Sequence, residues 1–130
     1  MARTPTDRER KSGTPVAMRE SLKKAVTEML VLFMVKQRPM YTYEMMQYIK
    51  DMSGGVLTFN TLYQAIYRLV SFGYVEEIGK RVSDDNRVRV YFGITPAGLE
   101  YLPLIMQEYR AVTGVVDHIL SMDGRLEGET

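Results

Sequence analysis

The sequence predicts a mostly α-helical domain with one small β-hairpin and a long helix near its C-terminal end. Three observations carry this prediction. Apolar residues repeat at helical spacing in three segments before Gly73, alternate with period two over 88–94, and return to a helical repeat after Pro96. A period near 3.6 marks an amphipathic helix and a period of two marks a strand. The predicted order is therefore helix, helix, helix, hairpin, helix.

Residues 1–16 are expected to form a flexible arm, because two prolines and a glycine accompany four basic and two acidic side chains. Such an arm is either solvated or touches phosphates. The first helix is predicted over 18–36, and Pro39 ends it because the residue before a proline is disfavoured in the α region. Its apolar residues share one helical face: Leu22, Val26, Met29, Leu30 and Phe33.

Two shorter helices are predicted next. Thr42 is the expected N-cap of the second, which carries Met45, Ile49 and Met52 on one face and ends at Gly54-Gly55. Thr58 is the expected N-cap of the third, and Gly73 stops it. The third helix has an apolar face of Leu62, Ile66, Leu69 and Val70, and an opposite face of Asn60, Thr61, Tyr63, Gln64, Tyr67 and Arg68.

A β-hairpin follows, with strands expected over 74–81 and 88–94. Between them, Ser83 to Asn86 read SDDN, and Asp and Asn suit turns because they tolerate left-handed backbone. Thr95 as N-cap and Pro96 at the first helical position open the last helix, expected over 96–122 with a kink at Pro103. Its apolar seam has the spacing of paired helices: Ile105, Tyr109, Val112, Val116 and Ile119. Residues 123–130 are a polar tail.

Three helices followed by a hairpin form a winged helix-turn-helix, here over 17–95, in which the helix before the hairpin enters the major groove of DNA. Asn and Gln on that helix can bond adenine, Arg can bond guanine, and Thr can touch a thymine methyl group or a phosphate. The hairpin becomes the wing. Because Asp84 and Asp85 would repel phosphates, either the wing tip stays clear of DNA or the wing makes contact through Arg87 and Arg89 only.

Composition excludes several other classes of protein. The 130 residues include no Cys and a single His, His118, which excludes a disulfide scaffold and a cysteine zinc site and argues against a His-based triad. No paired-acid site or phosphate loop is visible, so we expect no enzyme, no metal and no cofactor. The longest apolar run, 29–35, falls short of the roughly 18–20 residues that span a bilayer, and the charged N-terminus lacks a signal core. We expect a cytoplasmic protein without membrane contact.

Several spaced motifs resemble the PadR family of bacterial transcriptional regulators. They are Pro39-Met40-Tyr41-Thr42-Tyr43-Glu44, Thr61-Leu62-Tyr63, Arg68-Leu69 with Gly73 after it, and Tyr91-Phe92 leading to Ile94-Thr95-x-x-Gly98. The match covers roughly residues 25–122 in order, and the single C-terminal helix is similar to that of the smaller PadR subfamily.

The resemblance implies a homodimer, joined through the C-terminal helix, that binds a palindromic operator in double-stranded DNA, usually as a repressor. The effector stays open: a planar aromatic compound at the dimer centre is one option, because Tyr109 takes the position of an aromatic residue that stacks on drugs in some relatives. The alternative role of Tyr109 is packing in the dimer. The resemblance places Tyr41, Tyr43, Thr61, Tyr63, Arg68, Arg87 and Arg89 where the family contacts DNA or shapes that surface. The side-chain chemistry and position of the third helix add Thr58, Asn60 and Gln64 to the DNA-binding candidates. The effector candidates are Tyr109, Met106 and Val112, and the dimer candidates are Leu22, Val26, Ile105, Tyr109, Val112, Val116 and Ile119.

The sequence departs from the family pattern at three places. The wing carries Asp84-Asp85-Asn86-Arg87 where the family often has Gly-Gly-Arg, Gln64 stands where it often has Pro, and Tyr109 is smaller than the usual Trp. The alternative function is a winged-helix module for protein–protein contact. In that case, neutralising Arg68, Arg87 and Arg89 should leave its function unchanged.

The near-zero net charge of +1 hides an asymmetry. Residues 1–98 hold 15 basic and 10 acidic side chains, whereas 99–130 hold 2 and 6. Much of the basic excess lies in the first 24 residues, which hold seven basic and three acidic side chains. We therefore expect part of the attraction to DNA phosphates to come from the arm and the first helix.

Overall fold

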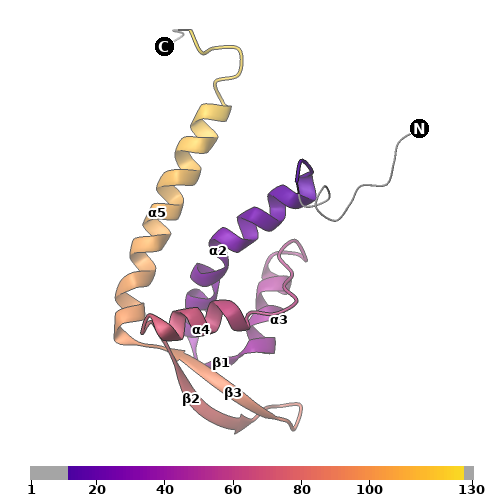
Figure 1. Cartoon of the computed structure of the whole chain (residues 1–130), viewed down its shortest axis with the longest axis vertical. Coiled ribbons are helices and arrows are strands. Elements are labelled where there is room, and N and C mark those ends of the chain that lie inside the picture. Colours follow the sequence, from indigo (N-terminus) through magenta and orange to yellow (C-terminus); the bar gives the residue numbers. More distant parts are fainter. Residues whose placement is uncertain (1–11, 128–130) are drawn as a thin grey trace, which may run out of the picture.

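The computed structural model describes residues 12–127, which form four helices and a three-stranded antiparallel sheet (Figure 1). The elements are α2 (Pro15–Gln37), β1 (Met40–Tyr41), α3 (Thr42–Met52), α4 (Tyr63–Ser71), β2 (Val75–Val82), β3 (Val88–Ile94) and α5 (Pro96–Leu120). The expected mostly α-helical class with a hairpin and a long last helix is confirmed.

The hydrophobic core lies where α2, α3, α4 and the base of α5 meet the sheet. Its fully buried side chains come from every one of these elements: Val31, Leu32, Met45, Leu62, Ile66, Leu69, Val75, Phe92 and Leu102. Burial of the apolar face of α4 in this core turns its polar face outward.

Helix α2 begins earlier than expected and buries a different face. Thr14 is its N-cap, accepting a hydrogen bond of 3.1 Å from the Ala17 amide, so the last two residues of the expected arm are helical. Residues 1–11 of that arm lie outside the described residues. The predicted apolar face is only half-buried, and Leu22 is 53% exposed, whereas the core face consists of Val31, Leu32, Met34 and Val35. Because 29–35 is apolar all round, periodicity alone could not select the core face.

Both predicted caps of the two short helices were wrong. Thr42 is the first residue of α3 and Tyr41 is its N-cap, because Tyr41 is held in extended backbone by pairing with Tyr91. Helix α4 begins at Tyr63, several residues after Thr58. The intervening loop has its own bonds: the Ser53 hydroxyl accepts from the Leu57 amide at 2.9 Å, and the Thr61 hydroxyl accepts from the Tyr63 amide at 3.2 Å.

The sheet has the strand order β1-β3-β2, and β1 is a two-residue strand that the sequence did not reveal. The hairpin forms as expected, with Asn86 in the left-handed region at φ 61°. A β-bulge between Glu77 and Gly79 interrupts the pairing of β2 with β3. Bulges increase the local twist of a strand pair, so the outer half of the hairpin twists away from the core as a wing.

Helix α5 opens as predicted, with the Thr95 hydroxyl accepting from the Gly98 amide at 3.0 Å and Pro96 in the first turn. It runs uninterrupted through Pro103 and ends at Leu120, two residues before the expected end. Its C-terminal half extends well beyond the other elements (Figure 1). No helix among residues 12–127 has the length and apolar character needed to cross a membrane.

Candidate nucleic-acid interface

The outward face of α4 and the turn before it hold most of the candidate base-reading residues. All of the following are exposed: Asn60, Thr61, Tyr63, Gln64, Tyr67 and Arg68. The rings of Tyr63 and Tyr67 stack with centroids 6.2 Å apart, and Tyr67 meets Phe92 edge-on at 5.9 Å. These aromatic contacts fix α4 against the sheet, so the polar face is presented on a rigid support.

A hollow of about 440 Å³ lies between the start of α4, the start of α3 and the wing, and we call it the wing-side hollow. It brings together six DNA-binding candidates: Tyr41, Tyr43, Asn60, Thr61, Tyr63 and Arg89. The other lining residues are Thr42, Met46, Tyr67, Val88 and Val90. Residues far apart in the sequence thus form one continuous polar and aromatic surface.

Arg89 is held in place within this surface. Its guanidinium donates a 2.6 Å hydrogen bond to the Asp85 carboxylate and lies 5.0 Å from the centroid of the Tyr41 ring. Hydrogen bonds from the Ser83 hydroxyl and from Arg89 lower the pKa of Asp85 to about 2. Burial, followed by the nearby Asp85 charge, raises the pKa of Tyr41.

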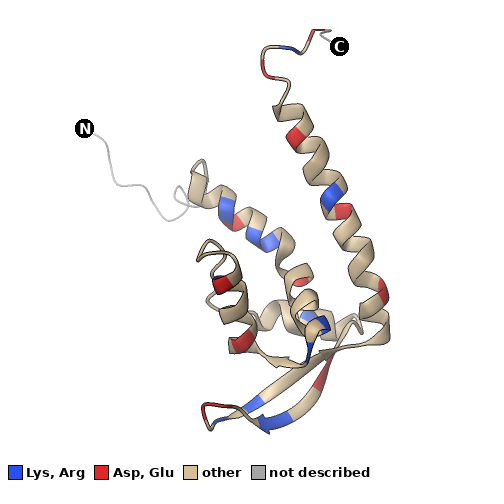
Figure 2. Cartoon of the chain, turned by 180° about the vertical axis from the view of Figure 1, so that it is seen from behind, with Lys and Arg blue, Asp and Glu red and all other residues tan. Residues whose placement is uncertain are grey.

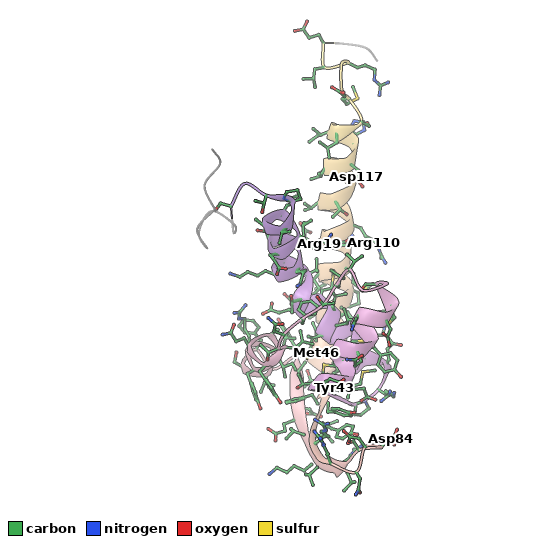
Figure 3. All side chains as sticks on the ribbon, turned by 90° about the vertical axis from the view of Figure 1, so that its right-hand side faces the viewer. Arg19, Tyr43, Met46, Asp84, Arg110 and Asp117 are labelled. Atoms are coloured by element: carbon green, nitrogen blue, oxygen red, sulfur yellow. The ribbon has the colours of Figure 1, made fainter. Side chains whose placement is uncertain are left out.

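The rest of the wing presents basic side chains outward. Arg87, Lys80 and Arg81 are exposed, and the Arg81 guanidinium lies 5.3 Å from the Tyr91 ring centroid. Asp84 lies at the outer end of the hairpin (Figure 3) and forms no ion pair with another residue of 12–127. One of the two acids at the wing tip is therefore already neutralised by an arginine of the wing itself.

Three DNA-binding candidates on α4 and its approach lie outside the wing-side hollow. Gln64 and Arg68 line a second hollow of about 280 Å³ on the other side of α4, the α2-side hollow, which Asn60 and Thr61 also border. Arg68 pairs there with Glu28 at 3.2 Å. Thr58 is exposed and lines neither hollow.

The α2-side hollow contains residues that sequence reasoning did not select for the site, namely Lys23, Lys24 and Phe59. The basic excess in the first 24 residues was a signal for the two lysines. Nothing in the sequence pattern indicated that Phe59 would lie beneath one of them, because that contact depends on the path of the loop before α4.

Two of the three effector candidates line one groove, and the third lies outside it. Met106 and Tyr109 line a small groove of about 130 Å³ between α2 and α5, together with Met29, Leu30, Phe33 and Arg110. Val112 does not line this α2–α5 groove. Tyr109 is 46% exposed, and the remaining seam residues of α5 beyond it are exposed as well.

Residues 12–127 contain no group of three His, Asp or Glu side chains placed to hold a metal ion.

The three helices, the hairpin and the outward polar face of α4 define a winged-helix DNA-binding protein of the transcription-regulator class.

The particular family follows from comparison with known proteins. A model of the transcriptional regulator PadR-like family matches residues 31–103, more than half of the chain, so the chain belongs to this family. Family members and structural neighbours are transcriptional regulators and not enzymes, in agreement with the sequence-based expectation.

Solved structures share the fold. A PadR-like transcriptional regulator of Bacillus cereus is 24% identical, with 84% of this chain and 99% of that chain covered at a TM-score of 0.65. A Streptococcus transcriptional regulator is 28% identical, with 75% of this chain and 95% of that chain covered at a TM-score of 0.64. A transcriptional regulator of Clostridium thermocellum is 22% identical, with 75% of this chain and 93% of that chain covered at a TM-score of 0.65. A search among curated proteins found no match.

Proposed function

We propose that the chain binds a palindromic operator as a homodimer and represses the promoter that contains it. The observation that carries this proposal is the outward polar face of α4, which continues without a break into the wing-side hollow. A helix presented in this way enters the major groove, where amide and guanidinium groups distinguish base pairs.

The side chains of α4 and of the wing would take different roles on DNA. Asn60 and Gln64 offer amides for adenine. Thr61 and the tyrosines of the wing-side hollow position the helix. Arg87 and Arg89 bind the adjacent DNA backbone. Arg68 has its charge paired with Glu28 in the free protein. On DNA, it would exchange this carboxylate for a guanine edge or a phosphate.

The dimer is proposed from α5. Its seam leaves Tyr109, Val112, Val116 and Ile119 exposed, and the helix extends past the rest of the chain (Figure 1). Ile105, also a seam candidate, is half-buried against the chain's own core. Apolar side chains at this spacing on a projecting helix stabilise a second helix packed alongside, and Leu22 and Val26 of α2 leave further apolar surface for the partner.

Gel shifts or anisotropy measurements with the DNA flanking its gene test the proposal. A good bidentate base contact contributes about 1–3 kcal/mol of discrimination. Gln64→Ala should therefore lower the preference for the operator over scrambled DNA by about tenfold or more, whereas Gln107→Ala on the exposed side of α5 should not. Equal affinity of the wild type for operator and scrambled DNA would reject sequence-specific reading and leave the protein–protein module as the function. Transcription from the bound promoter should rise when the protein is withdrawn.

A small aromatic effector is a second proposal, and the α2–α5 groove favours it. Methionine and aromatic side chains form a flexible, flat-sided lining that suits a planar ring. Binding of an apolar fluorescent dye such as anilinonaphthalene sulfonate should weaken in Tyr109→Ala and persist in Leu120→Ala, an exposed apolar residue outside the groove. Equal losses in the two variants would mean that the dye binds exposed apolar surface in general.

A further inference from the structure

We propose that Lys23 and Lys24 of α2 form a second phosphate-binding site, on the side of α4 opposite the wing. The inference rests on the proposed DNA-binding function and deepens it. The reading helix would then be held between two backbone contacts, one from the wing and one from α2.

The two hollows already described lie on either side of the start of α4. Both include Asn60 and Thr61 in their lining, but one continues to Arg89 and the other to Lys23 and Lys24. Figure 2 shows basic residues on the N-terminal half of α2 and on the hairpin, and in Figure 1 α4 lies between these two elements.

The spacing of DNA backbones explains why both sides matter. A major groove is about 12 Å wide, and a helix with its side chains is about 10–12 Å across. A helix that fills the groove therefore has a phosphate strand along each flank. The wing faces one of these strands, and the α2-side hollow faces the other.

Lys23 is preorganised for this role. Its side chain is only 12% exposed, and its ammonium lies 5.0 Å from the centroid of the Phe59 ring. Among residues 12–127, its carboxylate partner is Glu20 at 3.3 Å. Holding a lysine against an aromatic ring lowers the entropy lost when it binds an anion. Glu20 itself is more than half exposed and can turn away.

Lys24 supplies the accessible charge. It is exposed and makes no ion pair with another residue of 12–127. With Lys23 and Arg68, it gives the hollow three cations against two carboxylates, Glu20 and Glu28. The excess is positive, as a phosphate requires, and the two acids limit how tightly a free anion would bind.

The test measures operator affinity of the full chain as a function of salt. Each phosphate contact contributes about 0.9 to the slope of log affinity against log salt. Lys23→Gln with Lys24→Gln should therefore flatten the slope by up to about 1.8 per protomer, while the preference for operator over scrambled DNA stays the same. Lys24→Gln alone, at an exposed position, should flatten the salt slope by about 0.9.

Two control variants separate this site from general charge effects. Lys50→Gln, at the far end of α3 and outside both hollows, should leave the slope unchanged. Glu20→Gln should strengthen binding several-fold, because it frees Lys23.

A slope in Lys24→Gln equal to the wild type would overturn the inference, whereas absence of wild-type binding to any DNA would overturn the proposed function itself. If a free mononucleotide binds the wild type at the same concentrations and loses binding in Lys24→Gln, the site serves a small phosphate ligand and the assignment to DNA is wrong.

Discussion

The Arg89 guanidinium lies 2.6 Å from the Asp85 carboxylate, four residues earlier across the tip of the wing. The pair explains how a wing with two consecutive acids can face DNA. Asp85 is turned inward toward Ser83 and Arg89, whereas Asp84 at the tip forms no ion pair with any other residue in the described part of the chain. The same pair also keeps Arg89 over the Tyr41 ring, at the edge of the surface that would meet DNA.

Replacing Asp85 should strengthen DNA binding. In Asp85→Asn, Arg89 loses its carboxylate partner and becomes available to a phosphate, so affinity should rise several-fold and the salt slope should steepen by about 0.9. Asp84→Asn is the matched control, because it removes the same charge without freeing an arginine. Fluorescence anisotropy at several salt concentrations measures both variants. A slope no steeper in Asp85→Asn than in Asp84→Asn would contradict a role for Arg89 at the backbone.

The wing ion pair should survive mild acid. The folded-state pKa of Asp85 is lowered to about 2 by the Ser83 and Arg89 hydrogen bonds, against an ordinary value of 3.8. Since the folded pKa is the lower one, its stabilising contribution is fully present above about pH 4 and is lost as the pH falls through about 2. Carbon NMR of the Asp85 carboxyl group should show a midpoint near 2, shifting toward 3.8 in Arg89→Gln. A wild-type midpoint at the ordinary value would mean that the pair does not persist in solution.

Gly98 should be intolerant of any side chain. A Cβ at this position would overlap the Tyr74 carbonyl oxygen and come within 2.7 Å of the Ile94 side chain. Gly98→Ala should therefore lower the free energy of unfolding by about 1–3 kcal/mol, because backbone atoms must move. Gly114 in the same helix has open space where a Cβ would lie. Gly114→Ala should therefore raise the free energy of unfolding by about 0.5–1 kcal/mol, because Ala has the higher helix propensity. Urea unfolding compares the two, and equal effects would argue against this close approach.

The seam of α5 should control dimerisation. Val116→Asp places a charge among apolar side chains that we expect to be buried between protomers, so dimer affinity should fall by at least tenfold. His118→Asp introduces the same side chain on the opposite face of the helix and should leave the dimer intact. Sedimentation velocity distinguishes the two. A wild-type monomer at micromolar concentration, or equal effects of both substitutions, would refute the proposed interface.

Sequence reasoning succeeded where local signals agreed with the fold. The bounds of β3 and the start of α5 were predicted to the residue, since alternation and the Thr95-Pro96 cap are local properties. It failed at Thr42 and Thr58, where long-range or loop interactions decided the boundary. Pairing of Tyr41 with Tyr91 moved one cap, and the Ser53 and Thr61 hydroxyls fixed the loop that delayed α4.

The sequence predicted many of the residues of the candidate site but not how they are arranged in space. The sequence identified Gln64, Arg68 and Arg89 as DNA-binding candidates, yet it could not show that Gln64 and Arg68 line the α2-side hollow whereas Arg89 lines the wing-side hollow. It also described Asp85 as an obstacle to DNA, because an ion pair to Arg89 depends on the conformation of the turn. Side chains that gain their role from tertiary contacts, such as Lys23 above Phe59, were missed for the same reason.

Selection of bound DNA from a random pool reports base reading and dimer geometry together. A dimer that reads DNA through α4 should enrich one inverted repeat whose half-sites are centred about 10 base pairs apart or a multiple of that spacing. Enrichment of no sequence, or of a single half-site without its repeat, would contradict a dimer that reads DNA through α4.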